Sequence, residues 1–178
     1  MAKTINGLII VESPSKAKTL KKFLGDEYSI LASVGHIRDL PKNELGVDID
    51  NEFKPKYVPS KDKTKVINQL KSEVKNAENL YIATDPDREG EAIAWHLIEI
   101  LKPSIPVKRL VFHEITKQVI NESFTHTRDV DRSLVSAQES RRIIDRLWGY
   151  QVSQKLWFNV KGGLSAGRVQ SPAVKIVV

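Results

Sequence analysis

The spacing of apolar residues along the chain alternates between two periods, and this alternation predicts both strands and helices. Short apolar runs such as Leu8–Val11 are typical of strands buried on both faces of a sheet. The alternation of Ile30, Ala32 and Val34 indicates a further strand. The expected strands cover residues 8–11, 30–34, 80–83 and 107–112.

Between these strands, apolar residues recur at intervals of three or four, which is the period of a helix with one buried face. Ser13 and Pro14 supply a helix cap and a first-turn proline, and Gly25 would end that helix. Thr116 can cap a later helix in the same way. The expected helices cover about 14–24, 67–77, 89–101 and 116–124, and a longer one runs from about 131 to 147.

The alternation of strands and helices favours the α/β class, with a Rossmann-like parallel sheet of about four strands and helices on both faces. Residues 35–63 are rich in Gly, Pro, Asn and Asp, which indicates a long loop region. After residue 130 a partial, mostly helical segment follows, with a Gly-rich stretch that leads into an expected strand at 173–178. The change of pattern predicts a domain boundary near 126–131, and therefore domains of 1–128 and 129–178.

Composition narrows the class of protein. Hydrophobic residues make up 40% of the 178 residues, which is enough for a core and argues against disorder. No apolar run reaches the length of a membrane span, and the short run near the N-terminus is too short for a signal peptide. The chain has no cysteine, so disulfides and thiolate metal sites are excluded. A cytoplasmic protein is the simplest interpretation.

The net charge of +6 is placed unevenly along the chain. Residues 131–178 contain eight Lys or Arg against three Asp or Glu, so this segment alone carries +5. A basic segment of this kind favours a polyanionic partner such as nucleic acid, and a solvated helix face is the alternative.

An acidic group follows the third expected strand. Asp85, Asp87 and Glu89 alternate along the chain, and an extended backbone would direct all three carboxylates to one side. Carboxylates without His or Cys suit Mg²⁺ or Mn²⁺ better than zinc. The carboxyl ends of strands are also where open α/β sheets bind ligands. The alternative is a helix N-terminus whose acidic residues complement the helix dipole.

Glu12 occupies the equivalent place after the first expected strand. Beside three other carboxylates its pKa should be raised, so that it could act as a general acid. Lys16, in the first turn of the following helix, could bind a phosphate or simply lie in solvent. Arg88 could likewise hold a phosphate or pair with an acid, and the lone His36 is a weak signal by itself.

The second half of the chain adds a group of polar residues. Arg141 lies on the apolar stripe of the long helix, with Asp145 one turn later, so it should either form a buried ion pair or reach into a site between domains. In the Gly-rich stretch, Arg168 and Gln170 could donate hydrogen bonds to a closely approaching DNA strand. An ordinary loop is the alternative.

Taken together, these segments resemble bacterial type IA DNA topoisomerases, in order and over almost the whole chain. The acidic motif alone is shared with primases and some nucleases, so it indicates only a Toprim domain. The segments Glu12–Pro14 and Ser165–Gln170 are more specific. The matching segments are 11–18, 35–41, 84–96, 114–116, 141–146 and 164–171.

The resemblance implies a Toprim domain that acts on DNA with Mg²⁺. By resemblance, Glu12 would assist proton transfer at the scissile phosphodiester and Lys16 would contact that phosphate. Asp85, Asp87 and Glu89 would hold the metal, which is needed mainly for religation. The remaining residues would support the DNA-bound site or contact the single strand: Arg88, Arg141, Asp145, His36, Arg168, Gln170 and Ser165. The whole enzyme would relax negatively supercoiled DNA without ATP, through a 5′-phosphotyrosine.

Two departures from the family pattern matter. Pro86 stands where the family more often has Leu or Met. None of the four tyrosines, at 28, 57, 81 and 150, lies in the family's nucleophile motif, and transesterification needs a nucleophile. We therefore expect a monomeric piece of a longer topoisomerase, inert by itself. The alternatives are a Toprim nuclease or primase-like enzyme, a non-catalytic nucleic-acid-binding module and, more distantly, a phospho-acceptor domain.

Overall fold

The computed structural model describes residues 6–178, which form eight strands, six α-helices and one 3₁₀ turn. Their order is β1 (Gly7–Val11), α1 (Pro14–Leu24), β2 (Tyr28–Ala32), β3 (Arg38–Asp39), β4 (Val47–Asp48), β5 (Lys54–Pro55), β6 (Val58–Pro59), η1 (Lys61–Lys63), α2 (Thr64–Val74), β7 (Leu80–Ile82), α3 (Arg88–Leu101), β8 (Val107–Arg109), α4 (Lys117–Thr125), α5 (Arg132–Asn159) and α6 (Gln170–Val177).

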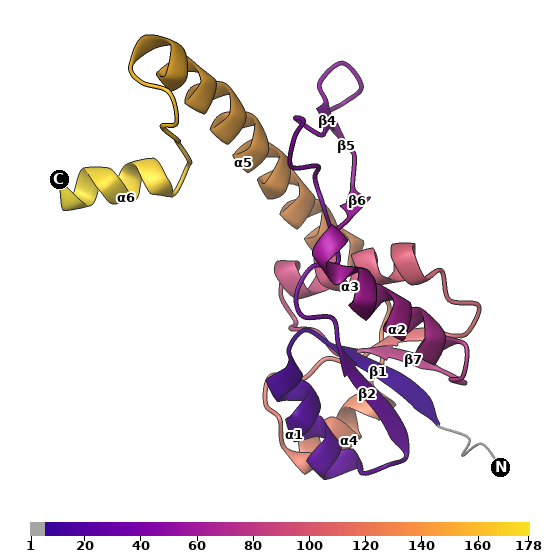
Figure 1. Ribbon diagram of the computed structural model, residues 1–178. Coiled ribbons are helices and arrows are strands. Elements are labelled where there is room, and N and C mark those ends of the chain that lie inside the picture. Colours follow the sequence, from indigo (N-terminus) through magenta and orange to yellow (C-terminus); the bar gives the residue numbers. More distant parts are fainter. Residues whose placement is uncertain (1–5) are drawn as a thin grey trace. The chain divides into compact units, whose positions relative to one another are not determined.

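A parallel sheet of four strands, in the order β2-β1-β7-β8, confirms the expected fold class (Figure 1). The central strand β1 pairs on one side with β2 and on the other with β7, so that Ile9 lies between Ile30 and Tyr81. Because all four strands are parallel, their carboxyl ends lie at one edge of the sheet. The candidate residues Glu12 and Asp85 follow β1 and β7 at this edge.

Alternate residues of β1 face two different helical layers. Leu8 and Ile10 pack with α2 and α3, whereas Ile9 and Val11 pack with α1 and α4. All four side chains are completely buried, which explains why the run is apolar without interruption. Figure 1 shows the two helical layers on opposite faces of the sheet.

The helix signals in the sequence are confirmed. The side chains of Ser13 and Thr116 accept hydrogen bonds from backbone N–H groups in the first turns of α1 and α4. Gly25 ends α1 with a φ of 62°, a conformation that glycine adopts without strain.

Several expected boundaries need correction. The segment 173–178 is not a strand, because Ala173 and Val178 donate helical hydrogen bonds to the carbonyls four residues earlier, and residues 170–177 form α6. A short apolar run fits either element, and no other described strand pairs with this one. Strand β8 ends at Arg109 rather than at residue 112, and α5 continues to Asn159 rather than ending near 147.

The expected loop region 35–63 contains four short strands and the turn η1. Strands β4 and β5 form an antiparallel hairpin in which Val47 pairs with Pro55. Strands β3 and β6 make up a second two-stranded sheet.

The chain divides into two compact units, and each consists of two separate segments. Unit 1 comprises the residues up to Asp39 together with Pro59–Ser136, and unit 2 comprises Leu40–Val58 together with Ala137–Val178. Unit 1 therefore contains the four-stranded sheet and the first turn of α5. The predicted domain boundary at 128/129 stays a prediction. Among the helices of residues 6–178, none combines the length and apolarity that crossing a lipid bilayer would require.

Candidate active site

The ends of β1 and β7 bring Glu12, Lys16 and Asp85 into contact. The Lys16 ammonium, in α1, donates hydrogen bonds to the carboxylates of both acids. The second carboxylate oxygen of Glu12 accepts the backbone N–H of Asp85 at 3.0 Å. Two neighbouring strand ends are therefore joined by one cation and one carboxylate.

Charge pairing outweighs burial in this group. Burial alone would lower the pKa of Lys16, but its hydrogen bonds to Asp85 and Glu12 raise that pKa above the ordinary value. Burial alone would raise the pKa of Asp85, but the hydrogen bond from Lys16 outweighs it, and that pKa lies below the ordinary value. Lys16 and Asp85 are therefore both charged at neutral pH.

The segment Thr84–Gly90, which we call the acidic loop, is closed by contacts between its two ends. The Thr84 hydroxyl donates to the carbonyl of Gly90 at 2.7 Å, and the Asp87 carboxylate caps α3 by accepting the N–H of Gly90 at 2.7 Å. A Cβ at Gly90 would lie 2.0 Å from the carbonyl oxygen of Asp85. Only glycine fits there. Arg88, the first residue of α3, is exposed, and its guanidinium has no partner among residues 6–178.

His36 lies beside the acidic loop, because its ring Nε2 shares a hydrogen bond with the Glu89 carboxylate. The turn that leads to His36 contains Val34 at a φ of 57°, a strained conformation for a β-branched residue. The Lys63 ammonium donates to the Val34 carbonyl at 2.9 Å and supports this turn.

The three carboxylates of the acidic loop do not converge. Asp85 contacts Lys16, Glu89 contacts His36, and Asp87 is used as a helix cap. An extended backbone would have directed all three side chains to one side of the chain. The backbone is no longer extended at Glu89, because α3 begins at Arg88. Within residues 6–178 no three or more His, Cys, Asp or Glu side chains are grouped so as to hold a metal ion.

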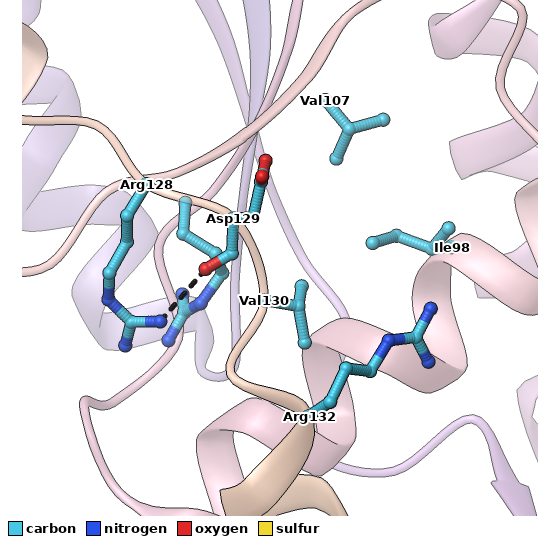
Figure 2. Close-up of a pocket in the computed structure, with 7 residues that line it drawn as sticks. Ile98, Val107, Arg128, Asp129, Val130 and Arg132 are labelled. Carbon is cyan, nitrogen blue, oxygen red and sulfur yellow. Dashed lines mark hydrogen bonds between the residues drawn. The ribbon is translucent and has the colours of Figure 1, made fainter.

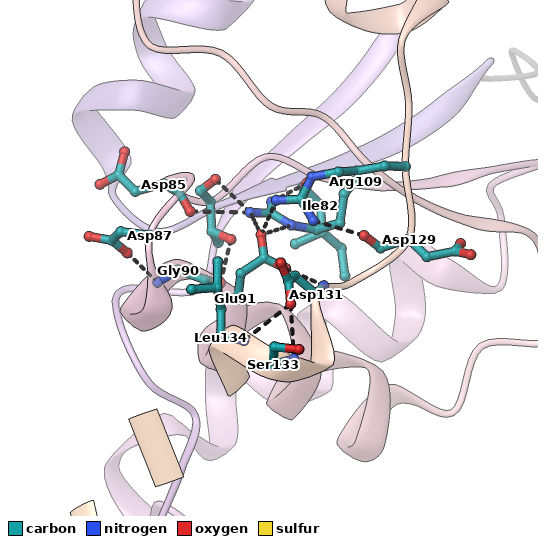
Figure 3. Close-up of polar contacts among 12 residues, drawn as sticks. Ile82, Asp85, Asp87, Gly90, Glu91, Arg109, Asp129, Asp131, Ser133 and Leu134 are labelled. Atoms are coloured by element: carbon teal, nitrogen blue, oxygen red, sulfur yellow. Dashed lines mark hydrogen bonds and ion pairs between the residues drawn. The ribbon is translucent and has the colours of Figure 1, made fainter. Parts of the chain in front are cut away.

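A buried ion pair between Arg109 and Glu91 fixes the backbone of the acidic loop from inside the fold. The side chains of Arg109 and Glu91 are both fully buried, and Arg109 donates to one Glu91 oxygen from two nitrogens, at 3.0 and 2.7 Å. The same guanidinium donates to three carbonyls, those of Ile82 at 2.7 Å and of Thr84 and Asp85 at 3.1 Å each (Figure 3). Arg109 therefore ties the end of β7 to the first turn of α3.

Two further groups complete the shell of Glu91. The Arg128 guanidinium donates to it at 2.7 Å, and the backbone N–H of Asp131 donates at 2.9 Å. Burial alone would raise the pKa of Glu91, but the hydrogen bonds from Arg109, Asp131 and Arg128 outweigh it and lower that pKa. The buried carboxylate is therefore charged.

In unit 2 the predicted polar residues form two contact groups. Asp145 contacts Arg168 at 3.2 Å and Arg141 at 3.7 Å. The pair of Arg141 and Asp145 exists, but the two side chains are 48% and 38% exposed, so the alternative of a buried ion pair is wrong. Gln170 donates to the Ser165 hydroxyl at 3.1 Å.

Comparison with known proteins identifies the family of the chain. Residues 7–115 match the Toprim domain family, and residues 129–178 match a family described as DNA topoisomerase. DNA topoisomerase 1 of Streptomyces coelicolor is 54% identical over 96% of this chain, which corresponds to 19% of that protein. The structure is similar to full-length topoisomerase I from Thermotoga maritima, with a TM-score of 0.86 and 50% identity, covering 96% of this chain and 29% of that chain.

The sheet, the acidic residues at its carboxyl edge and the matched residues together define a Toprim domain. The chain belongs to the Toprim family, in the form carried by bacterial DNA topoisomerases. The resemblance found in the sequence motifs is thereby confirmed. The chain spans about a fifth of the length of the curated relative that it matches.

Sequence reasoning missed the residues that hold the acidic loop from inside the fold: Thr84, Gly90, Glu91 and Arg109. A signal for Arg109 was present, because a charge inside an apolar strand must be compensated. Its partner could not be inferred, since Glu91 lies 18 residues away along the chain.

We expect Gly90→Ala to distort the acidic loop, because the new Cβ would overlap the Asp85 backbone. Overpacking of this kind costs about 1–3 kcal/mol in unfolding free energy, which urea unfolding followed by circular dichroism would measure. Gly162→Ala is the matched control, since nothing lies within 4 Å of its Cβ position. Equal stability of the two variants would contradict the close approach at Gly90.

Proposed function

We propose that this chain carries the phosphodiester site of an ATP-independent type IA DNA topoisomerase. The whole enzyme would relax negatively supercoiled DNA by cutting and resealing one strand. The observation that carries the proposal is the contact of Lys16 with both Glu12 and Asp85 at two adjacent strand ends. The family matches support it, since they cover both the sheet and the segment 129–178.

In the proposed reaction, a tyrosine oxygen forms a bond to phosphorus while the bond from phosphorus to the 3′ oxygen breaks. The product is a 5′-phosphotyrosine and a free 3′ hydroxyl, so the tyrosine loses a proton and the 3′ oxygen gains one. Glu12 is the candidate proton carrier, and Lys16 and Arg88 are candidate contacts for the phosphate oxygens. Religation reverses these steps.

Residues of the second unit would bind the DNA strand itself. Arg141, Arg168, Gln170 and Ser165 are exposed polar groups in the segment that carries most of the positive charge. We propose that they contact a single-stranded region, that Asp145 orients the two arginines, and that His36 supports the DNA-bound site. We further propose domains of 1–128 and 129–178, a monomer that works with the remainder of a topoisomerase chain, and a location in the bacterial cytoplasm with the nucleoid.

Magnesium is the proposed cofactor. The donor chemistry fits, because Asp85, Asp87 and Glu89 offer hard carboxylate oxygens on a partly exposed loop. When bound, the ion would neutralise negative charge near the phosphate, mainly during religation. Binding requires Asp85 to leave Lys16 and Glu89 to leave His36, since these two partners hold the carboxylates apart.

The proposal makes a counterintuitive prediction for Lys16→Met. The ammonium competes with a metal ion for Asp85, so its removal should tighten Mg²⁺ binding. Ion pairs that are as exposed as Lys16 and Asp85 contribute up to about 1 kcal/mol, which corresponds to about fivefold in affinity. Isothermal titration calorimetry would measure the change. Lys18→Met, on the same helix but exposed, is the control. Weaker or equal binding by Lys16→Met would argue against competition.

The 178-residue chain by itself should neither relax nor nick a negatively supercoiled plasmid in the presence of Mg²⁺, as judged by agarose gel electrophoresis. The reason is that none of its tyrosines lies in the family's nucleophile motif. Relaxation by this chain alone would refute the proposal that the nucleophilic tyrosine lies in the remainder of a topoisomerase chain. Nicking that disappears in Asp87→Ala would instead favour the Toprim nuclease.

Binding to single-stranded DNA tests the role of unit 2. Arg168→Ala should weaken the binding of a labelled oligonucleotide and reduce the slope of log K against log salt by about 0.7, as expected for one lost phosphate contact. Fluorescence anisotropy would measure both. Lys75→Ala, exposed at the end of α2, is the charge-matched control. Identical salt slopes for the two variants would exclude a phosphate contact by Arg168.

A further inference from the structure

The contacts of Glu91 extend beyond the acidic loop to the first turn of α5. One carboxylate oxygen of Glu91 accepts from Arg109 and Arg128, and the other accepts the backbone N–H of Asp131. Asp131 in turn caps α5 by accepting the N–H groups of two residues, Ser133 and Leu134 (Figure 3). We call residues 131–135 the root of α5. One buried carboxylate is shared between this root and the acidic loop, and both lie in unit 1.

We propose that Arg128 is a positioning residue that couples the root of α5 to the acidic loop. Among residues 6–178, the Arg128 guanidinium donates to Glu91 and to the carbonyl of Asp129, and not to a carboxylate of the acidic loop. It holds Glu91, Glu91 holds Arg109, and Arg109 holds the carbonyls of Thr84 and Asp85. The inference rests on the proposed function, which assigns the acidic loop its role at the phosphodiester.

Arg128 is the residue in this series of contacts whose side chain can change position. The side chain of Arg109 is fully buried and makes five hydrogen bonds, so it has no freedom to move without breaking the core. The Arg128 side chain is 38% exposed and borders a cavity of about 450 Å³ (Figure 2). The cavity is also lined by Ile98, Val107, Arg109, Asp129, Val130 and Arg132. Arg128 therefore has room to leave Glu91 while Arg109 remains in place.

Backbone hydrogen bonds also connect Arg128 to strand β8 of the sheet. The N–H of Arg109 donates to the carbonyl of Arg128 at 2.8 Å, and the N–H of Arg128 donates back at 3.3 Å. The segment that leads into α5 is thus fastened to the edge strand β8. A displacement of the root of α5 would act on Arg128 and Asp131 together, and both end on Glu91.

The bland alternative is that Arg128 only stabilises the fold. A residue that helps to position metal ligands has a further effect, because the loss of such a residue commonly weakens metal binding by about 10- to 100-fold. Coupling between Arg128 and the acidic loop requires more than proximity. The test therefore measures the stability of the acidic loop and that of the rest of the core separately. Arg109→Met is unsuitable, since it would leave Glu91 charged, buried and deprived of its main partner.

The test compares Arg128→Met with Arg132→Met in the 178-residue chain. Arg132 borders the same cavity, is exposed, and has no partner among residues 6–178. Hydrogen exchange without metal should be about tenfold faster in Arg128→Met at residues 84–90 and 131–135, with β1 (Gly7–Val11) unchanged. Arg132→Met should behave as the parent chain does. Unchanged exchange at 84–90, or equal acceleration in β1, would overturn the proposal.

Magnesium titration by calorimetry gives a second readout. Arg128→Met should bind Mg²⁺ about tenfold more weakly than the parent chain, and Arg128→Lys, which keeps the charge, should recover part of the loss. Equal affinity of Arg128→Met and the parent would overturn the coupling to the metal site. If the parent chain binds no Mg²⁺, the cofactor proposal fails, and the exchange measurement still decides the role of Arg128.

Discussion

The buried charge of Glu91 is the constraint on which the geometry of the site depends. An ionised carboxylate inside a protein costs several kcal/mol unless cations and hydrogen-bond donors surround it. Arg109, Arg128 and the N–H of Asp131 provide these groups. Because the Arg109 guanidinium has more donors than Glu91 can accept, its remaining N–H groups bind the carbonyls at the end of β7. Satisfying one buried acid thereby fixes the backbone of the acidic loop.

The exposed carboxylates of the acidic loop, in contrast, contact side chains from neighbouring segments. Asp85 pairs with Lys16, and Glu89 pairs with His36. These two partners come from the segments that follow β1 and β2, so the charge balance of the loop depends on three adjacent strand ends. A divalent ion would have to compete with these partners, which links metal binding to the freedom of Lys16, the same group that is the candidate phosphate contact.

Much of the fold followed from local patterns. The uninterrupted apolar run at Leu8–Val11 predicted a strand that is buried on both faces, and both of its faces are indeed buried. Ser13 and Gly25 predicted the ends of α1, because caps act within a few residues of the helix that they terminate. At 170–178 the local pattern was ambiguous, and the expected strand proved to be the helix α6. No partner strand is available there among the described residues, and a strand without a partner leaves its backbone groups unsatisfied.

The sequence by itself determined the fold class, the family and the candidate residues, because periodicity, caps and motifs are carried by residues close together along the chain. It could place Glu12 and Asp85 at the same edge of the sheet, since parallel strands share a carboxyl edge. Only the tertiary structure decided that Lys16 lies between them, that Glu89 turns toward His36, and that Arg109 holds the acidic loop from inside. Each of these facts depends on partners that are distant along the chain. For Arg109 the physical reason is burial, since a charge removed from water must be paired with a group that the packing brings near.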